Sequence, residues 1–251
     1  MAFMVTLLPS TDCDIGRWLL QHYRVDYREH PHAPLFHILA LKWYGFGADD
    51  YPLLVDGKKF EPMVDQILSH CESMAEAEKK LLPEDPALKK SVEDLQVHFR
   101  LTLGIGVVNW AYYNLLPYKN LTWASFTTGV PWYEKLSVAL TYPLIRSLMI
   151  KGLNLNAEVA AEGLKKVYEG FDQVDAMLAD GRSYLVGDRF TYADLAFAGA
   201  FAPMVLAKGY GGHLPELEKT PPKMREIIRQ LRERPAGKFI QRLYDEHRHS
   251  P

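Results

Sequence analysis

The order of strand and helix signals in the first 75 residues restricts this 251-residue chain to few folds. Residues 3–8 (FMVTLL) predict a strand, residues 11–23 an amphipathic helix, and residues 25–29 (VDYRE) a second strand. Because a helix joins these strands, they should pair in parallel. Residues 52–55 and 58–61 then flank Asp56-Gly57, a strong β-hairpin signal, and residues 63–72 predict another helix. The predicted order is β-α-β followed by β-β-α.

Strand signals stop near Ser73, and only helical patterns follow. Helices are predicted over residues 86–115, 131–152, 156–179, 191–208 and 221–246. The helix at 191–208 is apolar on nearly every side, so it should be buried at the centre of its domain. The sequence therefore predicts an α/β plus all-α fold, with a small α/β domain over residues 1–75 and an all-helical domain over residues 84–246.

Charge and cysteine content narrow the classes of function. The formal net charge of −2 gives no general attraction for nucleic acid. Residues 219–251 carry nine Lys/Arg against four Asp/Glu, which we interpret as a solvated helix face rather than a patch for an anionic partner. Two cysteines are too few for a disulfide framework. With no signal peptide or membrane span apparent, we expect a cytoplasmic protein without a nucleic-acid or membrane partner.

Three segments carry a resemblance to a known family. The first, YPLLVDGKKFEPMVDQIL, opens a strand with proline, although proline lacks a backbone donor. The second, SYLVGDRFTYADLAFAGAFAP, has Thr191 and Asp194 at capping-box spacing, so Asp194 should stabilise the helix rather than act in catalysis. The third is RERPAGKF. With the element order, these segments resemble the cytosolic glutathione transferase family over almost the whole chain. The resemblance implies a thioredoxin-like N-terminal domain and a C-terminal helical bundle.

The resemblance places glutathione along the sheet edge beside Pro52. The proline at this position of the family forms a cis peptide bond, so the backbone of Tyr51 should be free to pair with an extended peptide. The resemblance assigns Glu61 to the ammonium of the γ-glutamyl group. The next residue normally offers an N–H and a hydroxyl to its carboxylate, but here it is Pro62, which has neither donor. We expect this departure to weaken glutathione binding.

Two residues near the start of the first helix are candidates for the chemical centre. Counting back from the second strand selects Ser10, whose hydroxyl would donate a hydrogen bond to the glutathione thiolate. Counting forward from the first strand selects Cys13, which would attack or form a mixed disulfide. The sequence leaves both assignments open, and helix capping alone is a third interpretation of either residue.

The resemblance also places a pocket for a hydrophobic second substrate between the domains. Trp110 and Tyr113 are candidates for its wall, although aromatic residues at helical spacing more often form a core. Residues 117–129 are expected to form a loop that covers the cleft.

A metal site has only weak support. His30, His32 and His37 follow the second strand, but no carboxylate or cysteine shares their spacing, so we expect no metal.

Together these features predict a homodimeric glutathione transferase of the kind used in detoxification, with glutathione as co-substrate. It would activate the glutathione thiol for conjugation to, or reduction of, a hydrophobic small molecule. The alternative is a non-catalytic binding or interaction protein on the same fold, with weakened affinity for glutathione. A third possibility is an interaction domain that docks through the basic C-terminal helix.

Overall fold

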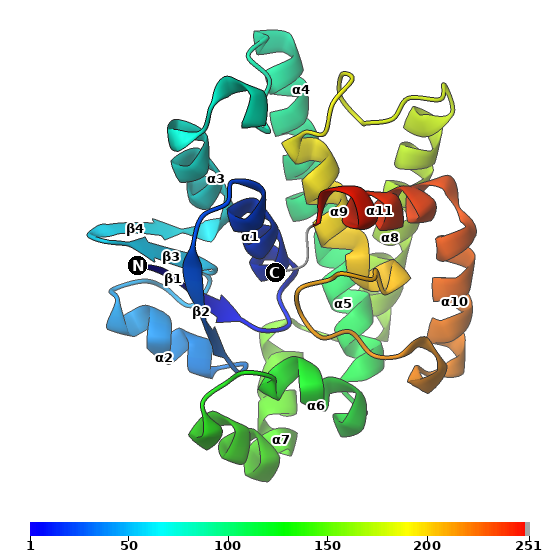
Figure 1. Ribbon diagram of the computed structural model, residues 1–251. Coiled ribbons are helices and arrows are strands. Elements are labelled where there is room, and N and C mark those ends of the chain that lie inside the picture. Colours follow the sequence, from blue (N-terminus) through cyan, green and yellow to red (C-terminus); the bar gives the residue numbers. More distant parts are fainter. Residues whose placement is uncertain (249–251) are drawn as a thin grey trace.

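The computed structural model describes residues 1–248 and consists of a four-stranded sheet beside a larger group of helices (Figure 1). The sheet order is β2-β1-β3-β4, with β1 parallel to β2 and antiparallel to β3, and β3 antiparallel to β4. The strands are β1 (Ala2–Leu7), β2 (Tyr27–His32), β3 (Leu53–Asp56) and β4 (Lys59–Pro62). This arrangement confirms the predicted thioredoxin-like half, including the parallel pair and the hairpin.

The two faces of the sheet are covered by different helices, because side chains alternate along each strand. Met4 and Leu54 pack on the side of α1 (Thr11–His22) and α3 (Met63–Met74). Val5, Leu53 and Val55 instead pack with Leu41 of α2 (Phe36–Trp43).

Helix α2 was not predicted, because the sequence pattern indicated no element between the second strand and the hairpin. It is short, and its N-cap Leu35 makes no side-chain hydrogen bond, so the sequence carries no start signal for it. Burial against the sheet stabilises it instead.

The remaining helices confirm the all-α half. The bounds are η1 (Ala77–Lys79), α4 (Pro86–Val97), the π-helical η2 (His98–Leu103), α5 (Gly104–Leu115), α6 (Lys119–Thr127), α7 (Trp132–Gly152), α8 (Ala157–Leu178), α9 (Tyr192–Val205), η3 (Leu217–Lys219), α10 (Pro222–Glu233) and α11 (Pro235–His247). Helix α9 runs through the centre (Figure 1), and its Thr191–Asp194 capping box is formed as predicted. Both groups are buried, so Asp194 satisfies backbone donors at a buried helix start.

Two predictions about the helical half were wrong. Residues 117–129 contain helix α6 instead of a loop, because Leu121 and Phe126 are buried when the segment coils against α7. The predicted helix over 221–246 is divided into α10 and α11 at Arg234, which is extended before Pro235. A residue before proline is biased away from helical geometry, and Pro235 begins the next helix instead.

Helix α7 is apolar on two sides. Val138 and Ile145 are buried, whereas Trp132, Leu136 and Leu140 are exposed. Among residues 1–248, no single helix is long and apolar enough to cross a membrane, and only α7 and α8 taken together pass on length and composition, with a bend of 67° between them.

Helix α1 lies between the sheet and α9 (Figure 1), and its buried residues belong to one core that is continuous across both halves. Ile15 of α1 packs so closely on Gly199 of α9 that a side chain at Gly199 would overlap it. This close contact holds the start of α1 at a fixed position between the sheet and the helical half.

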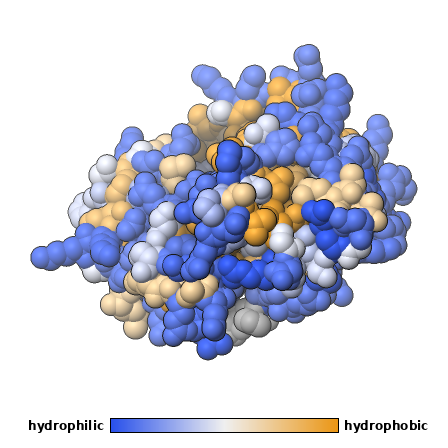
Figure 2. All heavy atoms as spheres, turned by 90° about the horizontal axis from the view of Figure 1, so that it is seen from above, coloured by the Kyte–Doolittle hydropathy of each residue, from blue (hydrophilic) through white to orange (hydrophobic). Residues whose placement is uncertain are grey.

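Seen from above, the surface of the molecule is mainly hydrophilic, with apolar side chains gathered at its centre (Figure 2).

Candidate functional site

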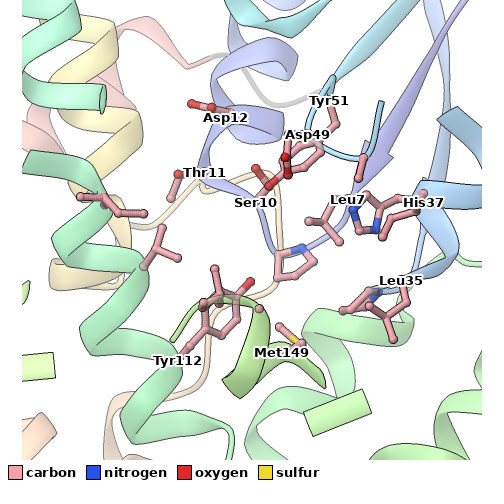
Figure 3. A pocket seen from close by; sticks show the side chains of 18 of the residues that line it. Leu7, Ser10, Thr11, Asp12, Leu35, His37, Asp49, Tyr51, Tyr112 and Met149 are labelled. Carbon is pink, nitrogen blue, oxygen red and sulfur yellow. The ribbon is translucent and has the colours of Figure 1, made fainter. Parts of the chain in front are cut away.

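A cleft of about 410 Å³ opens where the start of α1 faces α5 and the end of α7 (Figure 3). The side chains in it come from the loop before α1, from the residues around α2, from the segment before β3, and from the helical half. They include the polar and aromatic residues Ser10, Asp12, His37, Tyr51, Arg100 and Tyr112.

The peptide bond between Tyr51 and Pro52 is cis, as predicted. Pro52 packs under α1, where a Cβ added to Gly16 would lie 3.0 Å from the Pro52 Cγ. The Pro52 carbonyl accepts a hydrogen bond of 2.8 Å from the Met63 N–H. By contrast, no hydrogen bond within residues 1–248 uses the backbone N–H or carbonyl of Tyr51. These two groups are therefore available to an extended ligand at the cleft.

Ser10 lines the cleft and is the N-cap of α1. Its hydroxyl oxygen accepts a hydrogen bond of 3.3 Å from the Cys13 N–H, which leaves its own proton available to an acceptor in the cleft. The free N–H groups at this helix start also favour a negative charge nearby.

Cys13 does not reach the cleft. Its side chain is fully buried, and burial raises the pKa of its thiol to about 12. A reactive cysteine must be accessible to solvent and have a lowered thiol pKa. Both features therefore oppose the nucleophilic role that counting forward from the first strand suggested for Cys13. The structure corrects that assignment and leaves Ser10 as the candidate.

Both cysteines should therefore be unreactive in the folded protein. Cys71 is also buried, and burial raises its thiol pKa to about 12. We expect an aromatic disulfide reagent at neutral pH to detect no rapidly reacting thiol in the native protein and both thiols after denaturation. Rapid reaction of one native thiol that is lost in Cys13→Ala would contradict the burial of Cys13.

Glu61 and Pro62 are not among the residues that line the cleft. The Glu61 carboxylate lies 3.5 Å from the Nδ1 atom of His70, on the side of the sheet covered by α3. Pro62 is the N-cap of α3 and makes no side-chain hydrogen bond, and Met63 follows it with a φ of 64°. Of the predicted group, Tyr51 lines the cleft, Pro52 packs under α1 behind it, and Glu61 and Pro62 lie at the start of α3.

The basic residue of the cleft, Arg100, is already paired with carboxylates, whereas Asp49 has no ion pair within residues 1–248. Arg100 donates to both carboxylate oxygens of Asp65 at 2.8 and 3.0 Å, and its Nε lies 3.2 Å from Asp12. Burial raises the pKa of Asp12, and the Arg100 charge opposes that effect. Among the described cleft residues, Arg100 is the only Lys or Arg. The cleft therefore holds no unpaired guanidinium or ammonium for a ligand carboxylate.

His37 is the histidine that the structure brings to the cleft, with its ring edge-on to the Tyr51 ring at a centroid distance of 5.3 Å. Burial lowers the pKa of His37 to about 4, so its ring is neutral near pH 7. His32 instead bonds to Glu134 at 2.7 Å, and His30 stacks on Phe3. Within residues 1–248, no group of three His, Cys, Asp or Glu side chains is arranged to hold a metal ion.

The aromatic residue of α5 that lines the cleft is Tyr112, and not the predicted Trp110 or Tyr113, because this helix presents a different side to the cleft. Trp110 is buried in the core, and Tyr113 is exposed away from the cleft. Tyr112 lies between them and points into the cleft (Figure 3). Leu101, Ile105 and Val108 share its side of the helix, a spacing of three to four residues that the sequence already contained.

The similarity to known proteins agrees with this arrangement. Residues 157–230 match the family described as glutathione S-transferase, C-terminal domain. A glutathione S-transferase from Sinorhizobium meliloti 1021 is 17% identical, with a TM-score of 0.57 over 96% of this chain and 91% of that chain. This chain has the glutathione transferase fold.

Two further solved structures have this transferase fold at similarly low sequence identity. The theta class glutathione S-transferase from Xanthomonas axonopodis pv. citri, solved with glutathione bound, is 16% identical, with a TM-score of 0.53 over 100% of this chain and 97% of that one. FzlA from C. crescentus is 17% identical, with a TM-score of 0.57 over 99% of both chains. No curated protein matches the sequence. Identities this low establish the fold, whereas the activity depends on the site itself.

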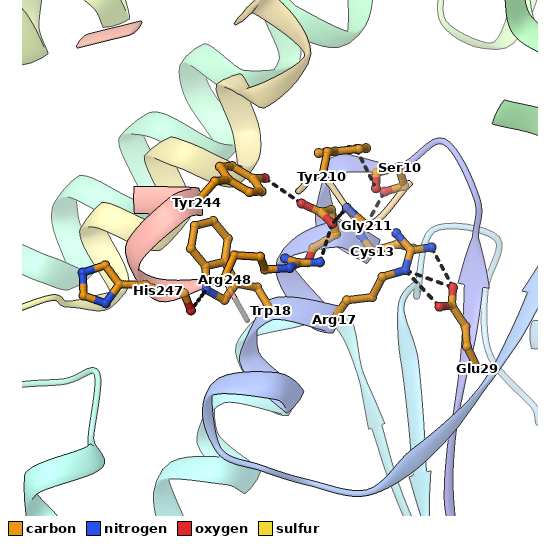
Figure 4. Close-up of polar contacts among 11 residues, drawn as sticks. Ser10, Cys13, Arg17, Trp18, Glu29, Tyr210, Gly211, Tyr244, His247 and Arg248 are labelled. Carbon is orange, nitrogen blue, oxygen red and sulfur yellow. Dashed lines mark hydrogen bonds and ion pairs between the residues drawn. The ribbon is translucent and has the colours of Figure 1, made fainter. Parts of the chain in front are cut away.

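In this transferase fold, the helix that carries Ser10 is anchored by a buried polar network (Figure 4). Asp14 of α1 is fully buried and accepts hydrogen bonds from the Gly211 N–H at 2.7 Å, the Tyr244 hydroxyl at 2.7 Å and the Arg248 guanidinium at 2.8 Å. The neighbouring Arg17 is paired in the same way with Glu29. Helix α11 and Arg248, which follows it, thus fix the position of the start of α1 beside the cleft.

The basic C-terminal segment is less available than its composition suggested. Arg234 pairs with Asp175, Arg229 with Glu218, and Arg242 with Glu246. Residues 249–251 lie outside the described part of the chain. Paired charges of this kind favour the interpretation as a solvated helix face over a docking patch.

Proposed function

We propose that the protein is a glutathione-dependent enzyme of the transferase type, which activates the thiol at Ser10. The observation that carries the proposal is the free backbone of Tyr51 beside a cis proline, in the same cleft as the Ser10 hydroxyl. An extended peptide that pairs with Tyr51 as an added strand would place its side chain near the start of α1. The cysteine side chain of glutathione would then lie beside the Ser10 hydroxyl and the N–H groups at the start of α1.

In the proposed reaction, Ser10 donates a hydrogen bond to the glutathione thiolate, and the thiol proton goes to solvent. The thiolate then forms a bond to an electrophilic carbon while the leaving group departs with its electron pair. The apolar wall formed by Ile105, Val108 and Tyr112 would hold the hydrophobic second substrate. A cytoplasmic homodimer acting in detoxification is part of this proposal.

A second candidate is a binding or interaction protein that has lost catalysis. It is favoured by the paired state of Arg100 and by the absence of Glu61 and Pro62 from the described cleft wall, since glutathione carries two carboxylates and one ammonium. Each missing charge-assisted hydrogen bond would weaken binding by about 1.5–3 kcal/mol.

Calorimetry separates the two candidates. We expect glutathione and its unreactive analogue S-methylglutathione to bind weakly and alike, because both can pair with the Tyr51 backbone. Glutathione alone should then support conjugation of chlorodinitrobenzene. Absence of heat at millimolar glutathione, together with no conjugation, would reject the enzyme in favour of the binding protein.

A further inference from the structure

A second cavity, of about 380 Å³, lies beside the end of α5 and the C-terminal half of α7. Of its described lining residues, only Tyr112 also lines the cleft. The Tyr112 side chain points into the cleft (Figure 3), and the same residue forms part of the wall of the second cavity. The second cavity is therefore a separate site, and nothing in the proposed transferase reaction uses it.

Arg146 of α7 lines this second cavity, and no carboxylate among the described residues forms an ion pair with it. Within residues 1–248, no hydrogen bond or ion pair reaches its guanidinium, and its Nε is buried without a partner. The nearby Tyr142 hydroxyl does not serve it, because that group is bonded to Thr122 at 2.6 Å and to the Leu116 carbonyl at 2.9 Å.

Arg146 is partly buried, and it differs from the three buried arginines of the described chain, each of which has a carboxylate partner. Arg17 is paired with Glu29, Arg100 with Asp65, and Arg248 with Asp14. The Nε of Arg146 is removed from water without gaining a hydrogen-bond partner, which is costly, and the planar fork of guanidinium donors matches a carboxylate with two parallel hydrogen bonds. Arg146 thus presents an unused anion-binding group to a cavity.

The other residues that line the second cavity indicate the chemistry of the rest of the ligand. No Asp or Glu occurs among the described residues that line it, so nothing there repels an anion. Its apolar members are Leu116, Pro117, Ile150, Leu155 and Pro221, and the exposed residues Tyr113 and Tyr118 also line it. The volume is in the range of small-molecule sites. We propose that this cavity binds an organic carboxylate with a compact apolar body, and that Arg146 holds its carboxylate.

Calorimetry with naphthalene carboxylate as the probe tests the proposal. We expect the purified protein to bind it in a one-to-one complex, and naphthylmethanol, which has the same ring but no charge, to bind at least tenfold more weakly. Arg146→Gln should weaken the carboxylate at least tenfold and leave the alcohol unchanged, because one charge-assisted pair is lost. Arg146→Lys keeps the charge without the fork and should give an intermediate affinity.

Three controls make the result specific. Lys135→Gln removes the same charge from an exposed position of α7 outside the cavity and should leave the affinity unchanged. Ser10→Ala and saturating S-methylglutathione should also leave it unchanged, so the site is tested independently of transferase activity. Equal affinity in wild-type protein and Arg146→Gln, or equal affinity of the carboxylate and the alcohol for the wild type, would overturn the proposal. Loss of carboxylate binding in Ser10→Ala would overturn it as well, by assigning the probe to the cleft.

Discussion

Replacement of Ser10 by alanine should lower kcat/KM for glutathione conjugation about 10²-fold. The hydroxyl of Ser10 is the donor that we assign to the thiolate, and loss of one such donor removes stabilisation of the developing anion. The pKa of bound glutathione should then move up toward the value of a free thiol, about 8.5. The pH profile of kcat/KM, measured from acid to alkaline solution, should therefore shift its rise to higher pH.

Two control variants separate this role from helix capping. Ser10→Thr keeps a hydroxyl and a cap, and it should retain most of the activity. Thr11→Ala removes the next hydroxyl in the same cleft and should change kcat/KM little. Loss of the Ser10 cap should itself lower the free energy of unfolding by about 1 kcal/mol. An unshifted pH profile in Ser10→Ala, with activity equal to the wild type, would refute the assignment.

Replacement of Asp14 by alanine should lower the free energy of unfolding by about 3–5 kcal/mol. The change leaves the buried Arg248 guanidinium without its carboxylate, and it removes the acceptor for the Gly211 N–H and the Tyr244 hydroxyl. Buried donors without partners carry the full cost of their lost hydration. Urea unfolding monitored by circular dichroism measures the change.

The matched control for Asp14 is Asp188→Ala, which removes an exposed carboxylate and should change stability by less than about 0.5 kcal/mol. Arg248→Met in the Asp14→Ala background should recover part of the loss, because no unpaired charge is then buried. Additive losses in the double variant would show that Asp14 and Arg248 do not act as a pair.

The parts of the fold that were predicted correctly depend on local chemistry. Asp56-Gly57 specifies a hairpin through backbone conformation, and Gly57 has the positive φ that this turn needs. Thr191 and Asp194 specify a helix start through their reciprocal hydrogen bonds. The parallel pairing of β1 and β2 follows from the helix between them. Such signals lie within a few residues of the structure they determine.

The parts that were missed depend on burial. Helix α2 has no side-chain cap, and α6 occupies a segment that was predicted to be a loop, so tertiary contacts stabilise both helices. The choice of Tyr112 over Trp110 and Tyr113 required the rotation of α5 about its axis. A helix with apolar residues on several sides does not reveal that rotation by its pattern alone.

The sequence by itself determined the order of the elements, the hairpin, the proline beside the cleft and the capped central helix, because each follows from neighbouring residues. Only the tertiary structure decided that Cys13 lies in the core while Ser10 faces the cleft, although they stand one helical turn apart. It also decided that Glu61 faces His70 and that Arg146 has no partner within residues 1–248. The physical reason is that burial and charge pairing depend on side chains brought together from distant parts of the chain.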